Sequence, residues 1–381
     1  MEIVDSYTTA ISTETKSSHY RLGLVMLEKL GLITHTKNLE RWLSTDNSIQ
    51  PTWIKVPNGG NDFWEYVPTI TLKDSGRAWS LTRATLKKQD LDALLYNTQI
   101  TALLSLGIMQ RIPTIITLDA TPENFNTVAE AYREQPLHTR LFRKKKFEWF
   151  RKVFNTAVKL APWSNWTKNS LINDYGVAPD KVTVIPPGVD LSNWQPKVKS
   201  ASEDGMLRLL FVGGDFARKG GEVLLKAMKS SLSDRCRLDI VTRDEIPQAG
   251  SSVRVHRGLT ANTPELRQLY AEADLFVFPT LGDVHSLVIM EAMASGLPVI
   301  STDVGAISEE VDHGTTGFLV PRQDPSAVVE AVNILLNDPQ KRRDMGVAGR
   351  EKAEKCFNGE LNYKALIALI KESIETSTKR S

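Results

Sequence analysis

Short apolar runs alternate with amphipathic segments along the second half of the chain. Three segments have the hydrophobic period of helices: GEVLLKAMKSSL, TPELRQLYAEA and SLVIMEAMAS. Five runs around them have the length of buried strands and end in turn-forming residues: LRLLFV, RLDIVT, VRVHRG, LFVFPT and PVIST. Strands that alternate with helices need crossover connections, so this pattern predicts a parallel sheet covered on both faces.

The first half of the chain repeats this rhythm more faintly. Its strand candidates are LDALLYN, PTIITLD, AVKLAPWS and KVTVIPPG. Its helix candidates are TALLSLGIMQ, a charged segment near residues 139–155, and KNSLINDYG. A polar stretch without periodicity, Trp194 to Met206, predicts a linker. We therefore expect two doubly wound α/β domains, residues 1–196 and 205–360, with a cleft between them and ligands bound beyond the carboxyl ends of the strands.

Composition narrows the class of protein. A chain of 381 residues fits two domains of about 150–200 residues each. The formal net charge of +2 gives no case for nucleic-acid binding. The two cysteines, Cys236 and Cys356, are far apart and lack metal-ligand spacing, which indicates a reducing compartment. With no apolar run of the ~20 residues that span a membrane and no secretory signal, we expect a cytoplasmic protein.

The first candidate site follows the strand LRLLFV, in the stretch FVGGDFARKGGEVLLKAM. Gly213 and Gly214 let the backbone approach a ligand closely. Arg218 and Lys219 stand just before a helix, whose N-terminus offers unpaired N–H groups and a partial positive charge. This arrangement favours a diphosphate site. The alternative is a flexible turn with two solvated cations.

The second candidate site is GDVHSLVIME, which follows the strand LFVFPT. Asp283 lies in a loop at the end of the strand, and Ser286 is a candidate N-cap for a helix that Gly296 and Pro298 end. Glu291 falls inside this helix, where a buried carboxylate needs hydrogen-bond donors. Sugar or ribose hydroxyls are suitable donors. The alternative, a side chain that reaches solvent or a neighbouring lysine, is not excluded by spacing alone.

These motifs resemble a known enzyme family. Glycosyl transferases group 1 (family 4) carry an E-x7-E pair within a stretch like E-G-F-G-L-V-x-L-E-A-M-A-x-G-x-P-V-I. The segment DVHSLVIMEAMASGLPVIST of this chain resembles that stretch. The segment after it, DVGAISEEVDHGTTGFLV, resembles the continuation of the family pattern. VGGDFARKGG is similar to their phosphate loop, V-G-R-L-x-x-x-K-G, and VTVIPPGVDLSNWQP to the segment that closes their first domain. The resemblance spans residues 207–335 and roughly 155–196. It implies the GT-B fold of two Rossmann-like domains, with a C-terminal helix, 362–381, that packs back on the first domain.

The resemblance also implies how a donor would bind. Lys219, with Arg218 beside it, would hold the diphosphate of a nucleotide sugar, UDP- or GDP-linked. Glu291 would accept hydrogen bonds from the ribose, and Asp283 would face the hydroxyls of the transferred sugar. The amides near Ser286 and Leu287 would cap the distal phosphate. Backbone near 257–260, including Gly258, would contact the base.

Several positions depart from the family pattern. The first glutamate of the pair is Asp283, one methylene shorter, and the usual Phe-Gly is His285 and Ser286, which puts a titratable ring beside the phosphates. Gly214 stands where the family has an arginine after V-G, and we expect Arg218 to supply the missing charge. The family often has a glycine-rich loop near the start of the chain, yet Thr8 to Tyr20 contains no glycine.

The resemblance implies the transfer of a hexose to a sugar, glycan or lipid-linked acceptor, with retention of the anomeric configuration. Family members work without a metal cofactor, and Asp90-Leu91-Asp92, although a D-x-D sequence, precedes a strand and is interpreted as structural. No side chain is predicted as a general base. Asp119, after PTIIT where the family often has histidine, is expected in the cleft near the acceptor. The alternative is a degenerate homologue that binds nucleotide sugar or partners without transfer.

One further segment carries many cations and aromatic side chains: HTRLFRKKKFEWFRKVF, residues 138–154. An interfacial helix on an anionic membrane has this composition, with basic residues at the lipid headgroups and aromatic residues below them. The alternative is an ordinary surface helix whose aromatic residues pack on the core of the domain.

Overall fold

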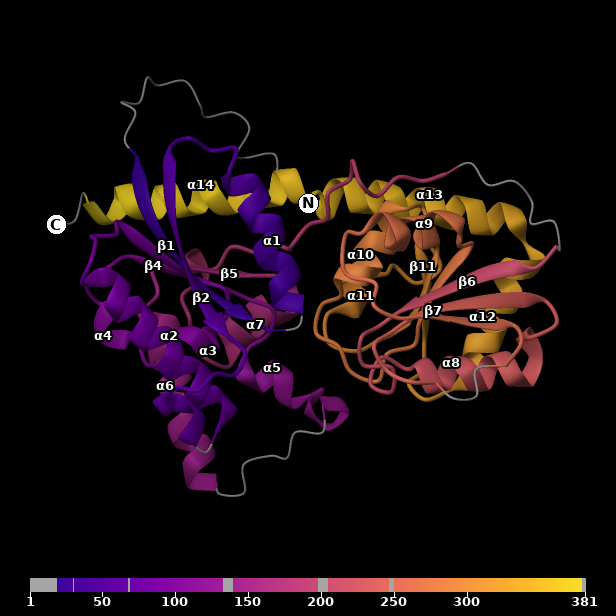
Figure 1. Ribbon diagram of the computed structural model, residues 1–381, viewed down its shortest axis with the longest axis horizontal. Coiled ribbons are helices and arrows are strands. Elements are labelled where there is room, and N and C mark those ends of the chain that lie inside the picture. The colour runs from indigo at the N-terminus through magenta and orange to yellow at the C-terminus, as the bar shows by residue number, and fades with distance from the viewer. Residues whose placement is uncertain are drawn as a thin grey trace.

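The computed structural model describes residues 19–29, 31–67, 69–132, 140–197, 205–246 and 250–378. The glycine-free stretch Thr8 to Tyr20 therefore lies almost entirely outside the described residues, as does the middle of the predicted linker. Two α/β domains lie side by side, and the two long helices at the end of the chain run across the top of both (Figure 1). The predicted fold class is confirmed.

The N-terminal domain is built on a parallel sheet with the strand order β2-β1-β3-β4-β5. The strands are β1 (Tyr20–Glu28), β2 (Ile49–Pro57), β3 (Ala93–Tyr96), β4 (Thr114–Leu118) and β5 (Lys159–Pro162). Its helices are α1 (Gly31–Leu43), η1 (Phe63–Tyr66), α2 (Ile70–Leu86), α3 (Gln99–Ala102), α4 (Leu106–Met109), α5 (Pro122–Asn126), η2 (Ala129–Tyr132), α6 (Arg140–Thr156), α7 (Asn165–Asn173) and η3 (Pro179–Lys181). The strand order reverses between β1 and β3, as in doubly wound sheets.

The C-terminal domain has a six-stranded parallel sheet in the order β11-β10-β9-β6-β7-β8. The strands are β6 (Leu207–Val212), β7 (Cys236–Val241), β8 (Val253–His256), β9 (Leu275–Phe278), β10 (Val299–Thr302) and β11 (Gly317–Val320). The helices are α8 (Gly221–Ala227), which a π-helical turn η4 (Met228–Leu232) continues, α9 (Pro264–Glu272), α10 (Leu287–Ala294), α11 (Ile307–Glu310), α12 (Pro325–Asn337) and α13 (Pro339–Cys356). The last helix of the chain is α14 (Gly359–Thr378). This is the Rossmann order, and its switch point lies between β6 and β9.

One predicted strand is wrong. KVTVIPPG is not a strand of the sheet: Val182 makes an isolated bridge to Leu160, and the N–H groups of Thr183 and Ile185 donate to the carbonyls of Leu160 and Pro162. Pro186 and Pro187 have no N–H group to donate to a neighbouring strand, so the ladder cannot continue. Three strands were not predicted: β1, β2 and β11.

The chain crosses from one domain to the other twice, and the two crossing segments lie side by side. The N–H of Val189 donates to the Phe357 carbonyl at 2.9 Å, and the N–H of Gly359 donates back to Val189 at the same distance. A Cβ on Gly188 would collide with the backbone of Gly359, so glycine is needed for this close approach. After this passage, α14 packs on the N-terminal sheet.

The packing of α14 is hydrophobic at its centre and polar at one end. Leu366, Ile370 and their neighbours share a buried cluster with Leu22 and Leu24 of β1. The Tyr363 hydroxyl lies 2.9 Å from Nδ1 of the buried His35. The C-terminal helix therefore belongs physically to the first domain, although it follows the second in sequence.

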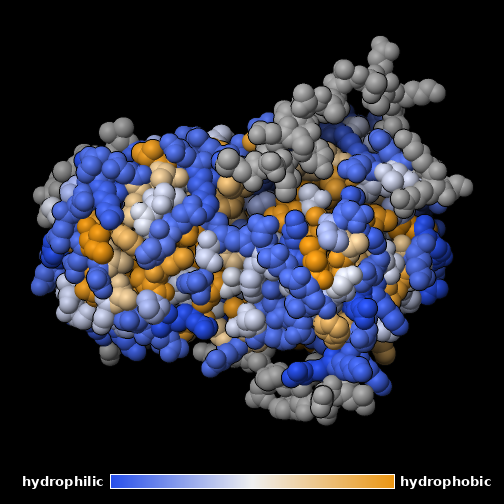
Figure 2. All heavy atoms as spheres, turned by 180° about the vertical axis from the view of Figure 1, so that it is seen from behind, coloured by the Kyte–Doolittle hydropathy of each residue, from blue (hydrophilic) through white to orange (hydrophobic). Residues whose placement is uncertain are grey.

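The back of the molecule mixes hydrophilic and hydrophobic residues over both domains (Figure 2). In the part of the chain that the structure describes, no helix combines the length and the apolar character that crossing a bilayer would require.

Candidate active site

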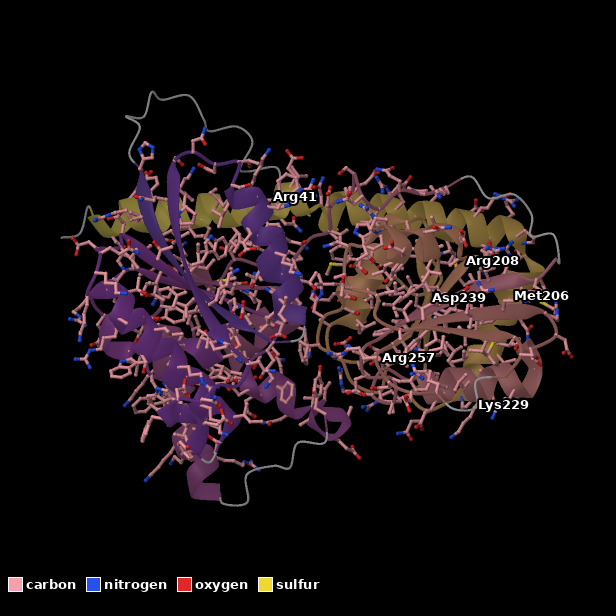
Figure 3. All side chains as sticks on the ribbon, in the orientation of Figure 1. Arg41, Met206, Arg208, Lys229, Asp239 and Arg257 are labelled. Carbon is pink, nitrogen blue, oxygen red and sulfur yellow. The ribbon has the colours of Figure 1, made fainter. Side chains whose placement is uncertain are left out.

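The candidate site lies where the C-terminal sheet reverses its strand order. The loops after β6 and β9 stand side by side there, because these two strands are neighbours. Met206, just before β6, lies on the side of the domain away from the N-terminal domain, whereas Arg257, just after β8, lies toward it (Figure 3). The carboxyl ends of these strands therefore face the other domain, which is where doubly wound sheets bind ligands.

The two loops are joined tightly. Gly220, with φ of +80°, has the left-handed conformation that glycine tolerates best, and a Cβ there would collide with the Pro279 carbonyl. The N–H of Leu281 donates to the Arg218 carbonyl at 2.9 Å. Nη1 of Arg218 in turn donates to the Gly282 carbonyl at 2.8 Å. These contacts bring the two sequence motifs into one site.

Lys219 and Asp283 form a buried ion pair at the centre of this site. Burial lowers the pKa of Lys219, although the neighbouring Asp283 acts in the opposite direction. A second cation, Arg218, lies next to Lys219 in sequence. The cation predicted for the diphosphate and the carboxylate predicted for the sugar are thus paired with each other.

The Arg218 side chain does not stand over Gly214, where a replacement for the missing family arginine would be needed. Its Nε donates to Asp215 at 3.1 Å, and its guanidinium lies 4.3 Å from the ring centroid of Tyr132 in the N-terminal domain. Arg218 therefore joins the phosphate loop to Gly282 and to the other domain. Sequence patterns gave no signal for Tyr132, because the contact depends on how the domains meet.

Glu291 is buried on α10, 4% exposed, and the Tyr270 hydroxyl of α9 donates to it at 3.0 Å. Burial raises the pKa of Glu291 to about 8, despite this hydrogen bond. The solvent-reaching alternative for Glu291 is therefore wrong. Tyr270 supplies one donor, and no ion pair with a described lysine or arginine compensates the carboxyl group.

The start of α10 differs from the prediction in one respect. Ser286 occupies the N-cap position, but its side chain makes no capping hydrogen bond. Its N–H donates to the buried Glu310 carboxylate at 2.6 Å, and Nδ1 of His285 lies 2.5 Å from the same oxygen. Burial alone lowers the pKa of His285, but Glu310 outweighs burial and raises it. The Glu310 carboxylate thus already accepts the hydrogen bond that the Ser286 amide was predicted to give to a phosphate. Leu287 is the first residue of α10.

The glycines differ in their surroundings. Gly213 donates to the Val241 carbonyl at 2.9 Å and lies against Lys219, so a side chain would crowd that lysine. Gly214 is exposed beside the Arg243 guanidinium. Gly258 has φ of +76° and open space around it, in the loop after β8 that was predicted to contact the base.

The N-terminal domain closes on this site through the segment after β4. A Cβ on Gly282 would collide with Ala131, so the close contact of the domains explains this glycine. Val284 packs with Ala120 and Val128 in a small cluster of its own. The N–H of Trp166 donates to Glu309 at 2.5 Å, which adds a polar contact between the domains.

Asp119 stands at the end of β4, at this domain boundary. Its carboxylate accepts the Ala120 N–H at 2.9 Å. Burial raises its pKa and the Ala120 N–H acts against this, while His285 lowers the pKa slightly and Asp283 raises it slightly. His285 and Asp283 belong to the other domain, so Asp119 lies at the domain boundary near the candidate site.

The D-x-D sequence is structural. Asp92 accepts hydrogen bonds from the N–H and the side chain of Arg21, and Asp90 lies 3.8 Å from the same guanidinium. Over the described ranges, no cluster of three or more His, Cys, Asp or Glu side chains is arranged to hold a metal ion. The metal independence of the reaction stays a prediction.

Helix α6 presents its aromatic side chains mostly to the core. Phe150 and Phe154 are buried, and Phe147 stacks on Tyr175 with ring centroids 4.7 Å apart. Trp149 is 43% exposed, but its Nε1 donates to the Leu103 carbonyl at 2.6 Å. The prediction that these aromatic residues insert below lipid headgroups is therefore wrong, because they pack on the core of the N-terminal domain.

Comparison with known protein families agrees with this geometry. The model of Glycosyltransferase Family 4 matches residues 34–193, and that of Glycosyl transferases group 1 matches residues 207–338. The chain belongs to glycosyltransferase family 4. The two matched regions correspond to the two domains of the structure, and the family predicted from the motifs is confirmed.

Relatives and solved structures extend this assignment. The chain is 29% identical over 273 residues to D-inositol 3-phosphate glycosyltransferase of Paenarthrobacter aurescens, covering 66% of this chain and 65% of that protein. It spans about half to two thirds of the length of the curated relatives it matches. Sucrose-phosphate synthase from Thermosynechococcus elongatus has the same fold, with a TM-score of 0.75, 19% identity and coverage of 94% of this chain and 100% of that one. HepE of Anabaena in complex with UDP gives a TM-score of 0.68 at 16% identity, covering 93% and 100%. The fold of this family 4 chain is GT-B.

Proposed function

We propose that this chain is a retaining, metal-independent glycosyltransferase that moves a hexose from a nucleoside diphosphate sugar to a sugar, glycan or lipid-linked acceptor. The observation that carries the proposal is the buried pair of Lys219 and Asp283, held at the switch point beside Arg218 and the start of α10. The proposal places the reaction in the cytoplasm, as expected from the composition.

The cations would act on the leaving group. Transfer breaks the bond between the sugar's anomeric carbon and the phosphate oxygen, and negative charge grows on the departing diphosphate. Lys219 would turn from Asp283 to this diphosphate, and in a site that excludes water its charge would stabilise the transition state strongly. Released from Lys219, Asp283 would accept hydrogen bonds from the sugar hydroxyls.

Glu291 would bind the ribose. Its carboxyl group is buried and has one hydrogen-bond donor, Tyr270, so it retains acceptor capacity for hydroxyl groups. The acceptor alcohol would attack from the same face that the diphosphate leaves. The acceptor proton would then pass to a phosphate oxygen of the leaving group, so no side-chain base is needed, and Asp119 would position the acceptor from the other domain.

The donor nucleotide is proposed as UDP or GDP. HepE, which has the same fold, was crystallised with UDP. The alternative is a degenerate homologue that binds a nucleotide sugar without transfer. Two observations favour this alternative. Position 214 has glycine where the family has arginine, and the Ser286 amide already donates to Glu310.

Nucleotide release from a panel of UDP-, GDP- and ADP-sugars in the presence of EDTA tests the proposal. We expect release from sugars of one base only, and an unchanged anomeric configuration in the product, measured by NMR. Tight donor binding without turnover on a broad set of acceptors would support the degenerate homologue instead. An absence of binding to every donor would refute the proposed site.

Membrane contact is proposed through charge alone. Arg143, Lys144 and Lys145 are exposed near the start of α6, where hydrophilic residues gather at the foot of the N-terminal domain (Figures 1 and 2). Each cation near an anionic surface contributes about 1 kcal/mol, so we expect the protein to cosediment with phosphatidylglycerol vesicles at low salt and to lose binding when Lys144, Lys145 and Lys146 become Glu.

The matched control carries the same three charge changes on the C-terminal domain, at the exposed Lys226, Lys229 and Lys355. It should bind vesicles nearly as well as the unchanged protein. Equal binding of both variants would contradict a role for α6.

A further inference from the structure

We propose that Arg243, from the loop after β7, supplies the phosphate-binding guanidinium that the phosphate loop itself lacks. The inference rests on the proposed function and names a residue of the same site that the sequence motifs did not indicate. Gly214 is exposed, and a Cβ built on it would lie 2.9 Å from Nη2 and 3.0 Å from Nε of Arg243. The arginine therefore fills the space that a side chain at 214 would occupy.

The backbone on both sides of Arg243 is fixed to neighbouring segments. The N–H of Thr242 donates to the His256 carbonyl at 3.2 Å, which continues the β7–β8 pairing beyond the strand. The Asp244 carboxylate accepts the N–H of Phe216 at 2.7 Å, which ties this loop to the phosphate loop. Arg243 is thus held over Gly214 by two anchored neighbours.

The Arg243 guanidinium is available for a ligand. Across the ranges that the structure describes, no hydrogen bond or ion pair engages it, and the residue is exposed. Arg218, by contrast, is committed to Asp215, Gly282 and Tyr132. An arginine forks two N–H groups toward phosphate oxygens, so an uncommitted guanidinium beside a glycine at the carboxyl end of β6 suits the diphosphate of a nucleotide.

This inference implies that an arginine at position 214 could do the work of Arg243. Gly214 has no left-handed φ, so Arg243 is the obstacle to a side chain there. Moving the arginine from 243 to 214 should therefore return one guanidinium to the same place. Gly214→Arg alone should crowd Arg243, because two guanidinium groups would then compete for one space.

Calorimetric titration with UDP, GDP and ADP, and then with the monophosphate and nucleoside of the base that binds, tests the role of Arg243. Arg243→Ala should weaken diphosphate binding roughly 10- to 100-fold and leave nucleoside binding unchanged, as expected for a lost charge-assisted hydrogen bond. The double variant Gly214→Arg, Arg243→Gly should recover most of the diphosphate affinity. Arg254→Ala is the control, since Arg254 is an exposed arginine on the adjacent strand β8.

Diphosphate binding by Arg243→Ala that equals binding by the unchanged protein would overturn this inference and leave the proposed function standing. An equal loss for nucleoside and diphosphate would also overturn it, because the effect would then not involve phosphate. Failure of the unchanged protein to bind any of the three diphosphates would refute the proposed function and the inference together.

Discussion

Replacement of Lys219 by methionine is expected to lower kcat/KM for sugar transfer by on the order of 10³-fold. The lysine lies at the switch point of the sheet, where the leaving group is proposed to bind, and its ion pair with Asp283 holds it in place. Methionine keeps the side chain up to the position of Cε and removes the charged group, so the loss should appear mainly in kcat. Steady-state kinetics with the donor identified by nucleotide release provides the measurement.

The same substitution should also reduce stability, because it leaves the Asp283 carboxylate buried without its cation. Removing one partner of a buried pair costs about 3–5 kcal/mol, measured as the free energy of unfolding in denaturant. The double variant Lys219→Met, Asp283→Asn should recover most of this stability and none of the activity. Lys226→Met, an exposed lysine on α8, is the control. Normal activity in Lys219→Met would remove Lys219 from the mechanism.

Much of the fold could be predicted from hydrophobic periodicity, because β6, β9 and β10 are short apolar runs that alternate with amphipathic helices. The strand β2 could not, because Pro51 and Pro57 interrupt it. Prolines are tolerated there because β2 is at the edge of the sheet, beside β1 only. In KVTVIPPG, by contrast, the prolines end the pairing with β5 after Ile185, so the apolar pattern predicts more strand than the chain forms.

The candidate site was predictable in its motifs but not in its pairings. Lys219 and Asp283 are 64 positions apart, and they meet because β6 and β9 are neighbours in the sheet. Glu291 accepts a hydrogen bond from Tyr270 of the preceding helix, and His285 forms an ion pair with Glu310 of the following one. Sequence spacing identifies which residues carry charge, whereas the strand order decides which charges touch. Arg243 depends on a third strand, β7, and had no local signal at all.

Replacement of Glu291 by glutamine is expected to stabilise the protein at alkaline pH while it impairs donor binding. Glutamine keeps an acceptor for the Tyr270 hydroxyl but has no proton to lose. The pKa of Glu291 is about 8 in the folded protein, against 4.5 for the exposed group. Between these two values the unfolded chain releases a proton that the folded chain keeps, so the unchanged protein loses stability as the pH rises.

The difference in unfolding free energy between the variant and the unchanged protein should therefore grow with pH. It should be small at pH 4.5, increase by about 1.4 kcal/mol per pH unit, and reach on the order of 4–5 kcal/mol near pH 8, above which it stays constant. Urea unfolding at a series of pH values measures it. Glu330→Gln, at an exposed position on α12, should show no such trend.

Donor binding supplies the second half of the test. Ribose hydroxyls that donate to Glu291 favour its ionised form, so binding near pH 7 should release a proton. The calorimetric binding enthalpy of the unchanged protein should then depend on the ionisation enthalpy of the buffer, and that of Glu291→Gln should not. A stability difference that does not change with pH would show that Glu291 is ionised in the free protein. Where the stability difference does change with pH, buffer-independent binding by the unchanged protein would show that the ribose does not meet this carboxylate.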